Sequence, residues 1–486
     1  MSASVTLSDI AVLLGHDLNI HLEISNVYHN SNDVTQGSIF VAIAGEKLHG
    51  AKFIDSAVAN GANAIVTDSR GAELANTSLP ILVVENPRRA LAEIASAIYG
   101  PKIKDLHLYG ITGTNGKTTT SHFLRALLPQ PAVAIGTTGV VYANHREELS
   151  RTTPEIDDLY RLFVNLRDEG IRDVVMEVSS HALVLERVTG LQFQSVGFTN
   201  LTTDHLDFHG TFENYHEAKS RLFQKNFSKY AVVCVDSNQG KAMADLAEEN
   251  GLVVSTVSAE NSAGTWYVTG LEVTNNSIQC TVQPLGISLT LSVGGSFNVS
   301  NALIAIAMAD QIAEVSDNQI KSLAAVRVPG RMQQISVNGL NAIVDYAHSP
   351  DAVAKVVSEV RKNTPGKLIV VIGAGGNRDQ DKRPLMGAAA AIADLVVVTD
   401  DNPRNENPDQ IRSMVIAGIS SAGGHYDEIS DRRAAIEYAA SLVSSPTDCV
   451  LVLGKGHEMG QQIGDVVKPF DDSLELERAL AERGLS

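Results

Sequence analysis

Cysteine is scarce in this sequence, and this excludes a disulfide-based fold. The 486-residue chain has three cysteines, Cys234, Cys280 and Cys449, and no C-x-x-C pair. Each lies in an apolar stretch, where free cysteine behaves as a small hydrophobic residue. We therefore expect three reduced, buried thiols and a cytoplasmic protein.

Long apolar runs and positive charge are also in short supply. No stretch approaches the ~18 consecutive apolar residues of a membrane span, and residues 1–5 carry no basic segment of the signal-peptide type. The 38 Lys and Arg residues face 56 Asp and Glu residues, which gives a net charge of −18. This balance argues against a nucleic-acid partner. Small anionic ligands stay possible, because helix N-termini and a few basic side chains can hold them locally.

Apolar material and regular alternation are abundant. Hydrophobic residues make up 44% of the chain, enough for several cores, and 486 residues correspond to about three domains. Strand-like and helix-like segments alternate, which predicts an α/β protein with parallel sheets. Gly-Pro and Pro-Gly pairs at 100–101 and 329–330 punctuate the chain. We expect domains at residues 1–101, 102–329 and 330–486.

The first and third blocks show this alternation clearly. In the first block, residues 38–43 and 64–67 are strand-like and residues 89–99 are helix-like. The third block has four short apolar runs that predict buried parallel strands, at residues 342–345, 368–372, 395–399 and 450–453. Ligands bind beyond the carboxyl ends of such strands, so we expect the chemistry in the loops that follow them.

A glycine-rich turn in the central block has the composition of a phosphate loop. The run G-I-T-G-T-N-G-K-T-T-T at residues 110–120 follows a strand-like segment and precedes a helix with one apolar face at 121–128. Backbone N–H groups would face an anion, Lys117 would add a point charge, and Thr118 would offer a hydroxyl to Mg²⁺. The first glycine of the pattern G-x-x-x-x-G-K-[ST] would fall at Ile111, however. A glycine turn that binds no nucleotide is the alternative.

The segment T-G-T-N-G-K-T resembles the ATP loop of the Mur ligases, the ATP-dependent amide-forming enzymes of peptidoglycan precursor synthesis. Folylpolyglutamate synthetases carry a similar loop. The resemblance runs in order along nearly the whole chain. It implies a small N-terminal α/β uridine-nucleotide domain, a central P-loop ATPase-type parallel α/β domain and a C-terminal Rossmann-like α/β domain. The ATP-binding residues that it implies are Gly113, Thr114, Asn115, Gly116, Lys117, Thr118, Thr119, Asn298, Arg331 and Asp345. By itself, Asn298 could also be a helix cap.

Acidic residues and histidines downstream of the loop suggest a metal site. Glu177 ends an apolar strand-like run and, from the residues alone, is either a strand-end acid or a ligand of nucleotide Mg²⁺. The segment E-V-S-S-H at 177–181 resembles the Mur ligase segment and favours the ligand. The run at 198–210 is dense in Asp and His; it is either a polar loop with Asp204 as a helix cap or a metal site, and its spacing fits no standard zinc pattern. It resembles the Mur ligase signature, which implies that His205 lies near a second metal.

Lys219 receives two opposite interpretations. Its place in a helix-like segment at 214–223 predicts a solvated surface lysine. The resemblance implies instead that CO₂ carbamylates Lys219, which converts the cation into a carboxylate that helps to hold Mg²⁺. The catalytic residues implied are then Lys117, Lys219 and His205, and the metal ligands are Thr118, Glu177, His205 and the Lys219 carbamate.

Basic and acidic residues follow the strands of the third block. Arg378, Arg404 and Glu458 would lie at neighbouring strand ends and could bind carboxylates and an ammonium group, or they could form surface charge pairs. The segment D-N-P-R at 401–404 resembles the diaminopimelate-recognition motif of one Mur ligase. The residues that the resemblance assigns to meso-diaminopimelate are Arg378, Asp401, Asn402, Pro403, Arg404, Gly454 and Glu458.

The donor site is inferred by resemblance alone. The segment around His29 and Ser31 resembles the uridine-diphosphate region of the family. The residues implied for the muramoyl peptide are Thr152, Thr153, Ser179 and Arg187. The chain has Leu185 where the family often has Gln, which puts that one peptide contact in doubt.

The expected activity is an ATP- and Mg²⁺-dependent ligation. It would join meso-diaminopimelate to the D-glutamate γ-carboxylate of UDP-N-acetylmuramoyl-L-alanyl-D-glutamate through an acyl phosphate, and we expect a monomer with small-molecule partners. The alternatives are a sibling ligase that adds L-lysine, a folylpolyglutamate synthetase-like ligase, and a non-catalytic P-loop nucleotide switch.

Overall fold

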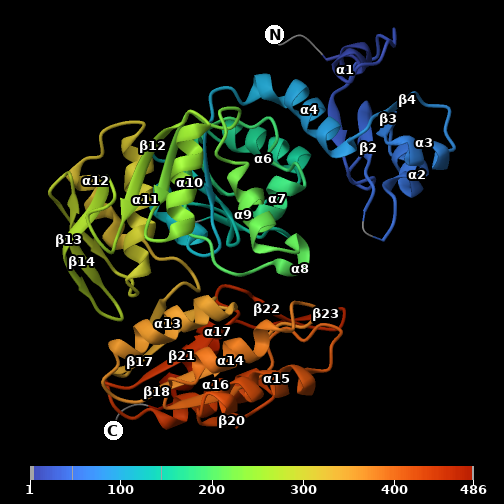
Figure 1. Ribbon diagram of the computed structural model, residues 1–486. Helices are drawn as coiled ribbons and strands as arrows, with labels where there is room; N and C mark the ends of the chain where they lie inside the picture. Colours follow the sequence, from blue (N-terminus) through green and yellow to red (C-terminus); the bar gives the residue numbers. More distant parts are fainter. Residues whose placement is uncertain (1–4, 46, 144, 484–486) are drawn as a thin grey trace.

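The computed structural model describes residues 5–45, 47–143 and 145–483, and it shows three α/β domains (Figure 1). In the view of Figure 1, the N-terminal domain lies beside the central domain and the C-terminal domain lies below it. Among the described residues, no helix combines the length and apolarity needed to cross a lipid bilayer. Cys234, Cys280 and Cys449 are free and buried, as predicted.

The N-terminal domain is built on a parallel sheet of order β1-β2-β3-β4. The strand-like runs at 38–43 and 64–67 form β2 and β3, and the helix-like segment is α4. This helix begins at Pro87, before the expected start, because the Asn86 side chain accepts hydrogen bonds from the N–H groups of Arg88 and Arg89. The elements are α1 (Leu7–Leu13), β1 (Asn26–Tyr28), β2 (Ser38–Ala42), η1 (Gly50–Phe53), α2 (Ile54–Ala59), β3 (Ala62–Thr67), α3 (Ser69–Leu74), β4 (Ile81–Val83), α4 (Pro87–Tyr99) and η2 (Gly100–Lys102).

In the described part of the chain, the central sheet has the order β15-β14-β13-β12-β11-β10-β5-β9-β6-β7-β8. Strands β5, β6 and β9 to β13 run parallel to their neighbours in that set, and antiparallel strands extend both edges. The apolar helix α11 is buried on nearly all sides. The elements are β5 (His107–Thr112), α5 (Lys117–Leu127), β6 (Ala132–Gly136), β7 (Gly139–Tyr142), β8 (His145–Glu147), α6 (Ile156–Asp168), β9 (Asp173–Glu177), α7 (Ser180–Val184), β10 (Phe193–Phe198), α8 (Leu206–His209), α9 (Phe212–Ser220), β11 (Tyr230–Cys234), α10 (Asn238–Glu249), β12 (Val253–Ser258), β13 (Trp266–Val273), β14 (Ile278–Gln283), β15 (Ile287–Leu291), α11 (Phe297–Asp310), α12 (Asp317–Ser322) and η3 (Leu323–Ala325).

The C-terminal domain has the sheet order β16-β17-β21-β18-β19-β20, and the four expected strands are the adjacent parallel strands β17, β21, β18 and β19. Their carboxyl ends therefore meet at one edge, as predicted. The elements are β16 (Gln333–Val337), β17 (Leu340–Asp345), α13 (Pro350–Lys362), β18 (Leu368–Ile372), α14 (Lys382–Ala390), β19 (Leu395–Val398), α15 (Pro408–Ser421), β20 (Tyr426–Glu428), α16 (Arg432–Leu442), β21 (Cys449–Leu453), β22 (Gly460–Ile463), β23 (Val466–Pro469) and α17 (Asp472–Ala481).

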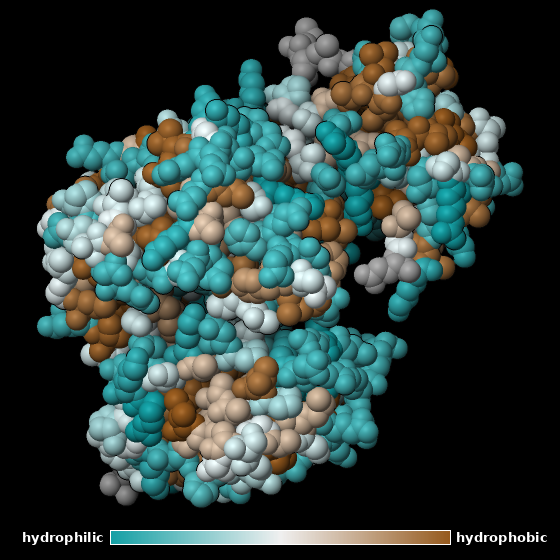
Figure 2. Space-filling view, in the orientation of Figure 1, coloured by the Kyte–Doolittle hydropathy of each residue, from teal (hydrophilic) through white to brown (hydrophobic). Residues whose placement is uncertain are grey.

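Polar and aromatic contacts join the domains. The ring of His457 contacts the carbonyl oxygen of Thr137 at 2.8 Å, which connects the C-terminal and central domains. On the other side, α4 of the N-terminal domain packs against α6, and the rings of Tyr99 and Tyr160 stack with their centroids 6.0 Å apart. The boundary between the central and C-terminal domains is largely hydrophilic on the face seen in Figure 2.

Candidate functional site

A cavity of about 1290 Å³ lies between the central and C-terminal domains. The phosphate loop, the strand ends of the C-terminal sheet and the segment at 151–153 all line it. Its lining includes these predicted residues: Thr114, Asn115, Gly116, Lys117, Thr118, Thr119, Thr152, Thr153, Glu177, Ser179, Arg187, His205, Asn298, Arg331, Asp345, Arg378, Asp401, Asn402, Arg404, Gly454 and Glu458. His29, Ser31, Gly113, Lys219 and Pro403 are not part of this lining.

The loop between β5 and α5 has the geometry of an anion cradle. Gly113 has a φ of 147°, and a Cβ there would come within 1.8 Å of Thr199 Oγ1, so only glycine fits. Gly116 is left-handed and leads directly into α5, which begins at Lys117 and includes most of the expected apolar segment. The backbone N–H groups of the first turn of α5 consequently face the cavity end of the helix.

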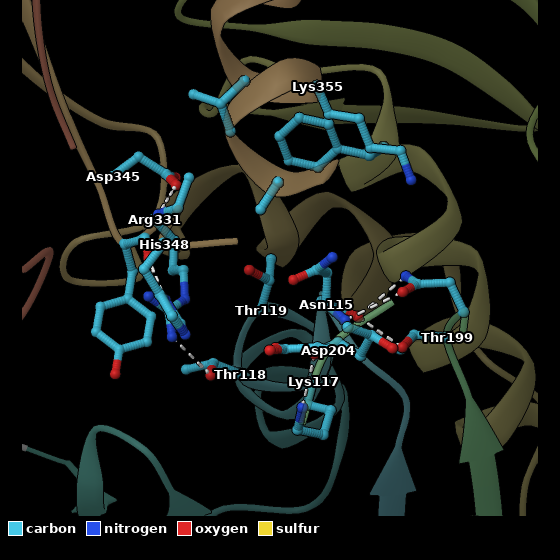
Figure 3. Close-up of a pocket in the computed structure, with 18 of the residues that line it drawn as sticks. Asn115, Lys117, Thr118, Thr119, Thr199, Asp204, Arg331, Asp345, His348 and Lys355 are labelled. Atoms are coloured by element: carbon cyan, nitrogen blue, oxygen red, sulfur yellow. Dashed lines mark hydrogen bonds between the residues drawn. The ribbon is translucent and has the colours of Figure 1, made fainter. Parts of the chain in front are cut away.

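The two basic residues at this loop come from different domains. Lys117 Nζ donates to the carbonyl oxygens of Gly113 and Thr114, both at 2.9 Å. Arg331 Nη2 donates to Thr118 Oγ1 at 3.2 Å, and the guanidinium stacks over the Tyr346 ring. Figure 3 shows Arg331 and His348 on one side of the loop and Asn115 and Thr199 on the other.

Glu177, at the end of β9, is a buried carboxylate with neutral partners. Its Oε1 accepts from the Thr137 backbone N–H at 2.9 Å, and its Oε2 accepts from Thr137 Oγ1 at 3.0 Å. Among the described residues, no Lys or Arg lies within ion-pair distance of Glu177, which is 1% exposed. A buried carboxylate without a counter-ion, in one cavity with the Thr118 hydroxyl, is a donor set that fits a hard divalent cation.

The prediction of a solvated Lys219 is wrong. The side chain is 1% exposed, and Nζ donates to the Gly113 carbonyl oxygen at 2.9 Å, behind the phosphate loop. Burial and the nearby Lys117 ammonium lower the pKa of Lys219 well below its usual range, against the opposing effect of Asp204. Helical spacing could have indicated that Lys219 is buried, because it lies four residues after the buried Tyr215 and three before the buried Leu222.

The loop rich in Asp and His does not cap a helix with Asp204. Helix α8 begins after His205, which has a left-handed backbone and makes no side-chain cap; Asp204 Oδ1 accepts from the His205 N–H at 3.0 Å. Loss of water and the nearby His181 and Lys117 lower the pKa of His205, against the opposing effect of Asp204. Both side chains line the cavity.

Among the described residues, the side chains that converge as a possible three-ligand metal group are His29, Asp157 and Asp158, outside the cavity. Arg161 already pairs with both aspartates. His29 Nδ1 lies 2.8 Å from Asp157 Oδ1, so this predicted nucleotide residue joins the N-terminal domain to α6. Ser31 is buried, and its carbonyl oxygen accepts from Asn60.

Two further predicted ATP residues are buried and hydrogen-bonded. Asp345 accepts from the N–H groups of Met332 at 2.7 Å and Ala347 at 2.8 Å, and burial raises its pKa. The capping interpretation of Asn298 is wrong, since its Nδ2 donates to the Gly294 carbonyl oxygen and Ser296 is the N-cap of α11. Asn298 thus keeps its place on the cavity wall.

The interpretation of Arg378 and Arg404 as surface charge pairs is not supported. In the described part of the chain neither forms an ion pair, and both line the cavity. Arg404 Nη1 donates to the Gly376 carbonyl oxygen at 2.7 Å. Burial and the neighbouring Arg378 lower the pKa of Arg404, against the opposing effects of Asp401 and Glu458. Glu458 Oε2 accepts from Asn402 Nδ2 at 2.9 Å.

The wall at 151–187 contains a cluster that sequence reasoning missed. Glu155 is buried and pairs with Arg187, Arg88 and Arg151, with nitrogen–oxygen distances of 3.0, 3.0 and 3.2 Å. Three guanidinium groups on one carboxylate leave this wall with excess positive charge. Thr153, fully buried, donates to the Glu177 carbonyl oxygen at 2.9 Å. Glu155 stands two residues after Thr153, a residue predicted for the muramoyl peptide, and that position was its only sequence signal.

Comparisons with known proteins agree along the chain. Three family models match: "Mur ligase family, catalytic domain" at residues 23–99, "Mur ligase middle domain" at 111–309, and "Mur ligase, glutamate ligase domain" at 330–456. A Streptomyces avermitilis protein named "UDP-N-acetylmuramoyl-L-alanyl-D-glutamate--2,6-diaminopimelate ligase" is 41% identical over 95% of this chain and 93% of its own. A protein of the same name from Caldanaerobacter subterraneus is 37% identical over 96% of both chains.

Solved structures show the same fold. A structure with that ligase name aligns with a TM-score of 0.70 at 31% identity and covers 99% of both chains. MurF from Acinetobacter baumannii aligns with a TM-score of 0.65 at 18% identity and also covers 99% of both chains, which shows the fold alone. Sequence and structure agree over nearly the full length, and the chain therefore belongs to the Mur ligase family.

Proposed function

We propose that this protein is an ATP-dependent, ADP-forming ligase that joins meso-diaminopimelate to UDP-N-acetylmuramoyl-L-alanyl-D-glutamate. One observation carries the proposal: a single cavity holds a phosphate loop, a basic donor wall, and an end that combines the carboxylates of Asp401 and Glu458 with two guanidinium groups that form no ion pair among the described residues. Relatives with that ligase name are about 40% identical over most of the chain. The reaction belongs to cytoplasmic peptidoglycan precursor synthesis.

The donor carboxylate must be activated, because an amine cannot displace hydroxide from a carboxylate at neutral pH. The γ-phosphoryl group of ATP passes to the D-glutamate γ-carboxylate and gives an acyl phosphate. The α5 N-terminus and the Lys117 ammonium stabilise the negative charge on the transferring group, and Arg331 reaches the same loop from the C-terminal domain. Gly113, Thr114, Asn115, Gly116, Thr119, Asn298 and Asp345 complete the ATP site.

Thr118, Glu177 and His205 are the residues that would hold Mg²⁺. Bound there, Mg²⁺ neutralises charge on the phosphate oxygens. Two hydrogen bonds from Thr137 fix the orientation of the Glu177 carboxylate, so its oxygens are oriented before a metal ion binds.

Carbamylation of Lys219 is supported by its lowered pKa. Only a neutral amine reacts with CO₂: Nζ forms a bond to the carbon, one C=O electron pair moves onto oxygen, and the nitrogen releases a proton. Burial and Lys117 favour the neutral amine, and carbamylation would convert that neutral amine behind the phosphate loop into an anion. The added carboxylate would be a further hard ligand for Mg²⁺.

The two other substrates would bind different walls of the same cavity. Thr152, Thr153, Ser179 and Arg187 would bind the muramoyl peptide, and His29 and Ser31 would lie on the uridine-nucleotide side. Arg378, Asp401, Asn402, Pro403, Arg404, Gly454 and Glu458 would bind meso-diaminopimelate. Its amine attacks the acyl phosphate, and the tetrahedral intermediate expels phosphate. We place the domains at residues 1–101, 102–329 and 330–486 and propose a monomer.

Phosphate release that depends on the amino acid tests the proposal. The purified enzyme, ATP, Mg²⁺ and the UDP-linked dipeptide should release phosphate with meso-diaminopimelate and very little with L-lysine. Preference for lysine would identify the sibling ligase, and activity with glutamate and a folate would identify the folylpolyglutamate-type enzyme. ATP hydrolysis at a rate that no amino acid changes would identify a nucleotide switch.

A further inference from the structure

Lys455 is a fully buried lysine next to the proposed acceptor end of the cavity. It follows β21 directly after Gly454, and its side chain is 0% exposed. Removing an ammonium group from water is costly unless charged or polar partners replace the water. The hydrogen-bond partners of Lys455 therefore indicate the role of this buried ammonium group.

Both partners of Lys455 are predicted acceptor residues. Its Nζ donates to Asn402 Oδ1 at 2.9 Å and to Glu458 Oε2 at 3.3 Å. Lys455 itself is not part of the cavity lining, whereas Asn402 and Glu458 are. The ammonium group thus lies behind the two residues that face the ligand.

The network leaves Asn402 one amide orientation. Oδ1 accepts from both Lys455 Nζ and the Gln462 backbone N–H, the latter at 2.9 Å, so Nδ2 must face Glu458. Glu458 Oε2 then receives two donors. Its other oxygen, Oε1, has the Tyr346 hydroxyl at 3.5 Å, the limit of a hydrogen bond. Glu458 Oε1 is therefore the oxygen available to a ligand.

The Glu458 carboxylate also has alternative ion-pair partners inside the cavity. The guanidinium groups of Arg378 and Arg404 line the same space without ion-pair partners among the described residues. A Glu458 carboxylate that is free to turn would pair with one of them. Such a pair would remove both the carboxylate that receives an ammonium and the guanidinium that receives a carboxylate.

We propose that Lys455 is a positioning residue for acceptor recognition: it holds Asn402 and Glu458 so that Glu458 Oε1 receives the ammonium group of a diamino acid and the two arginines stay free for its carboxylates. The proposal rests on the proposed function. It assigns Lys455 no contact with substrate and no part in phosphoryl transfer.

The test compares Lys455→Met with Lys468→Met, the same change on the exposed strand β23. In the phosphate-release assay, Lys455→Met should raise KM for meso-diaminopimelate at least tenfold and leave KM for ATP and for the UDP-linked dipeptide within about twofold. Lys468→Met should match the wild type. An unchanged acceptor KM, or an equal rise in all three KM values, would overturn the proposal.

A double-variant cycle separates positioning from general support of the fold. If Lys455 acts through Glu458, adding Lys455→Met to Glu458→Gln should change the acceptor KM less than twofold; multiplied effects would refute this. The same pair of variants decides the matter if Lys455→Met alone fails to fold, because the double variant removes both charges. A wild-type enzyme without diaminopimelate-dependent phosphate release would refute the proposed function instead.

Discussion

Acceptor choice offers a sharp test of the arrangement around Arg404. meso-Diaminopimelate is lysine with a second carboxylate on its far carbon. Arg404 lines the cavity, donates one hydrogen bond to the Gly376 carbonyl oxygen, and has no ion-pair partner among the described residues. If it pairs with that carboxylate, lysine would leave the guanidinium unpaired.

The magnitude follows from the burial of Arg404. Leaving one partner of a buried charge pair alone costs about 2–5 kcal/mol. Arg404 is only partly buried, so water offsets some of this cost, and we expect about 2–3 kcal/mol, or ~30- to ~150-fold in kcat/KM between the two amino acids. Arg404→Ala should remove most of this preference. It should lower kcat/KM for diaminopimelate and leave kcat/KM for lysine within a few-fold of its wild-type value.

The backbone of Arg404 calls for a second variant. Its φ is 51°, a left-handed conformation that costs alanine about 1–2 kcal/mol and glycine almost nothing. Arginine and alanine carry this strain alike, so Arg404→Ala adds none, and Arg404→Gly, which relieves it, should give the same diaminopimelate-to-lysine ratio. Arg433→Ala, an exposed arginine of the same domain, is the matched control. An unchanged diaminopimelate-to-lysine ratio in both Arg404 variants would refute the reasoning.

Three further predictions concern the central domain and its contact with the N-terminal domain. Lys117→Ala should lower kcat about 100-fold or more while the unfolding temperature changes little, because the lost charge acts on the transferring phosphoryl group; near-normal turnover would remove the phosphate-loop assignment. Lys219→Ala should lose most activity and recover part of it in the presence of a small carboxylic acid; full activity without the acid would exclude the carbamate. His29 has a raised pKa, because Asp157 outweighs the effect of burial. Its charged contact with Asp157 should therefore stabilise the chain fully below pH ~6.5 and fade as pH rises through the raised value. Unfolding temperatures of the wild type and His29→Asn should differ more at pH 6 than at pH 9, and a constant difference would contradict the assignment.

Local sequence determined the elements and the loops that carry chemistry. Short apolar runs predicted β17, β18, β19 and β21, since such runs suit strands buried on both faces. The glycines of the phosphate loop predicted a cradle, because only glycine tolerates the φ of Gly113 and its approach to Thr199. The order of the strands, however, depends on crossovers that no local pattern encodes.

Tertiary structure alone decided which groups meet. Thr137 follows β6 whereas Glu177 ends β9, Arg331 reaches Thr118 from another domain, and Lys455 reaches Asn402 across the strand ends. Burial also decides charge: the sequence of α9 makes Lys219 a basic residue, but packing behind the phosphate loop takes its ammonium out of water and lowers its pKa. Contacts between residues distant in sequence decide how far each functional side chain is removed from water and which partner it has. Burial and partner together determine its charge and its chemistry.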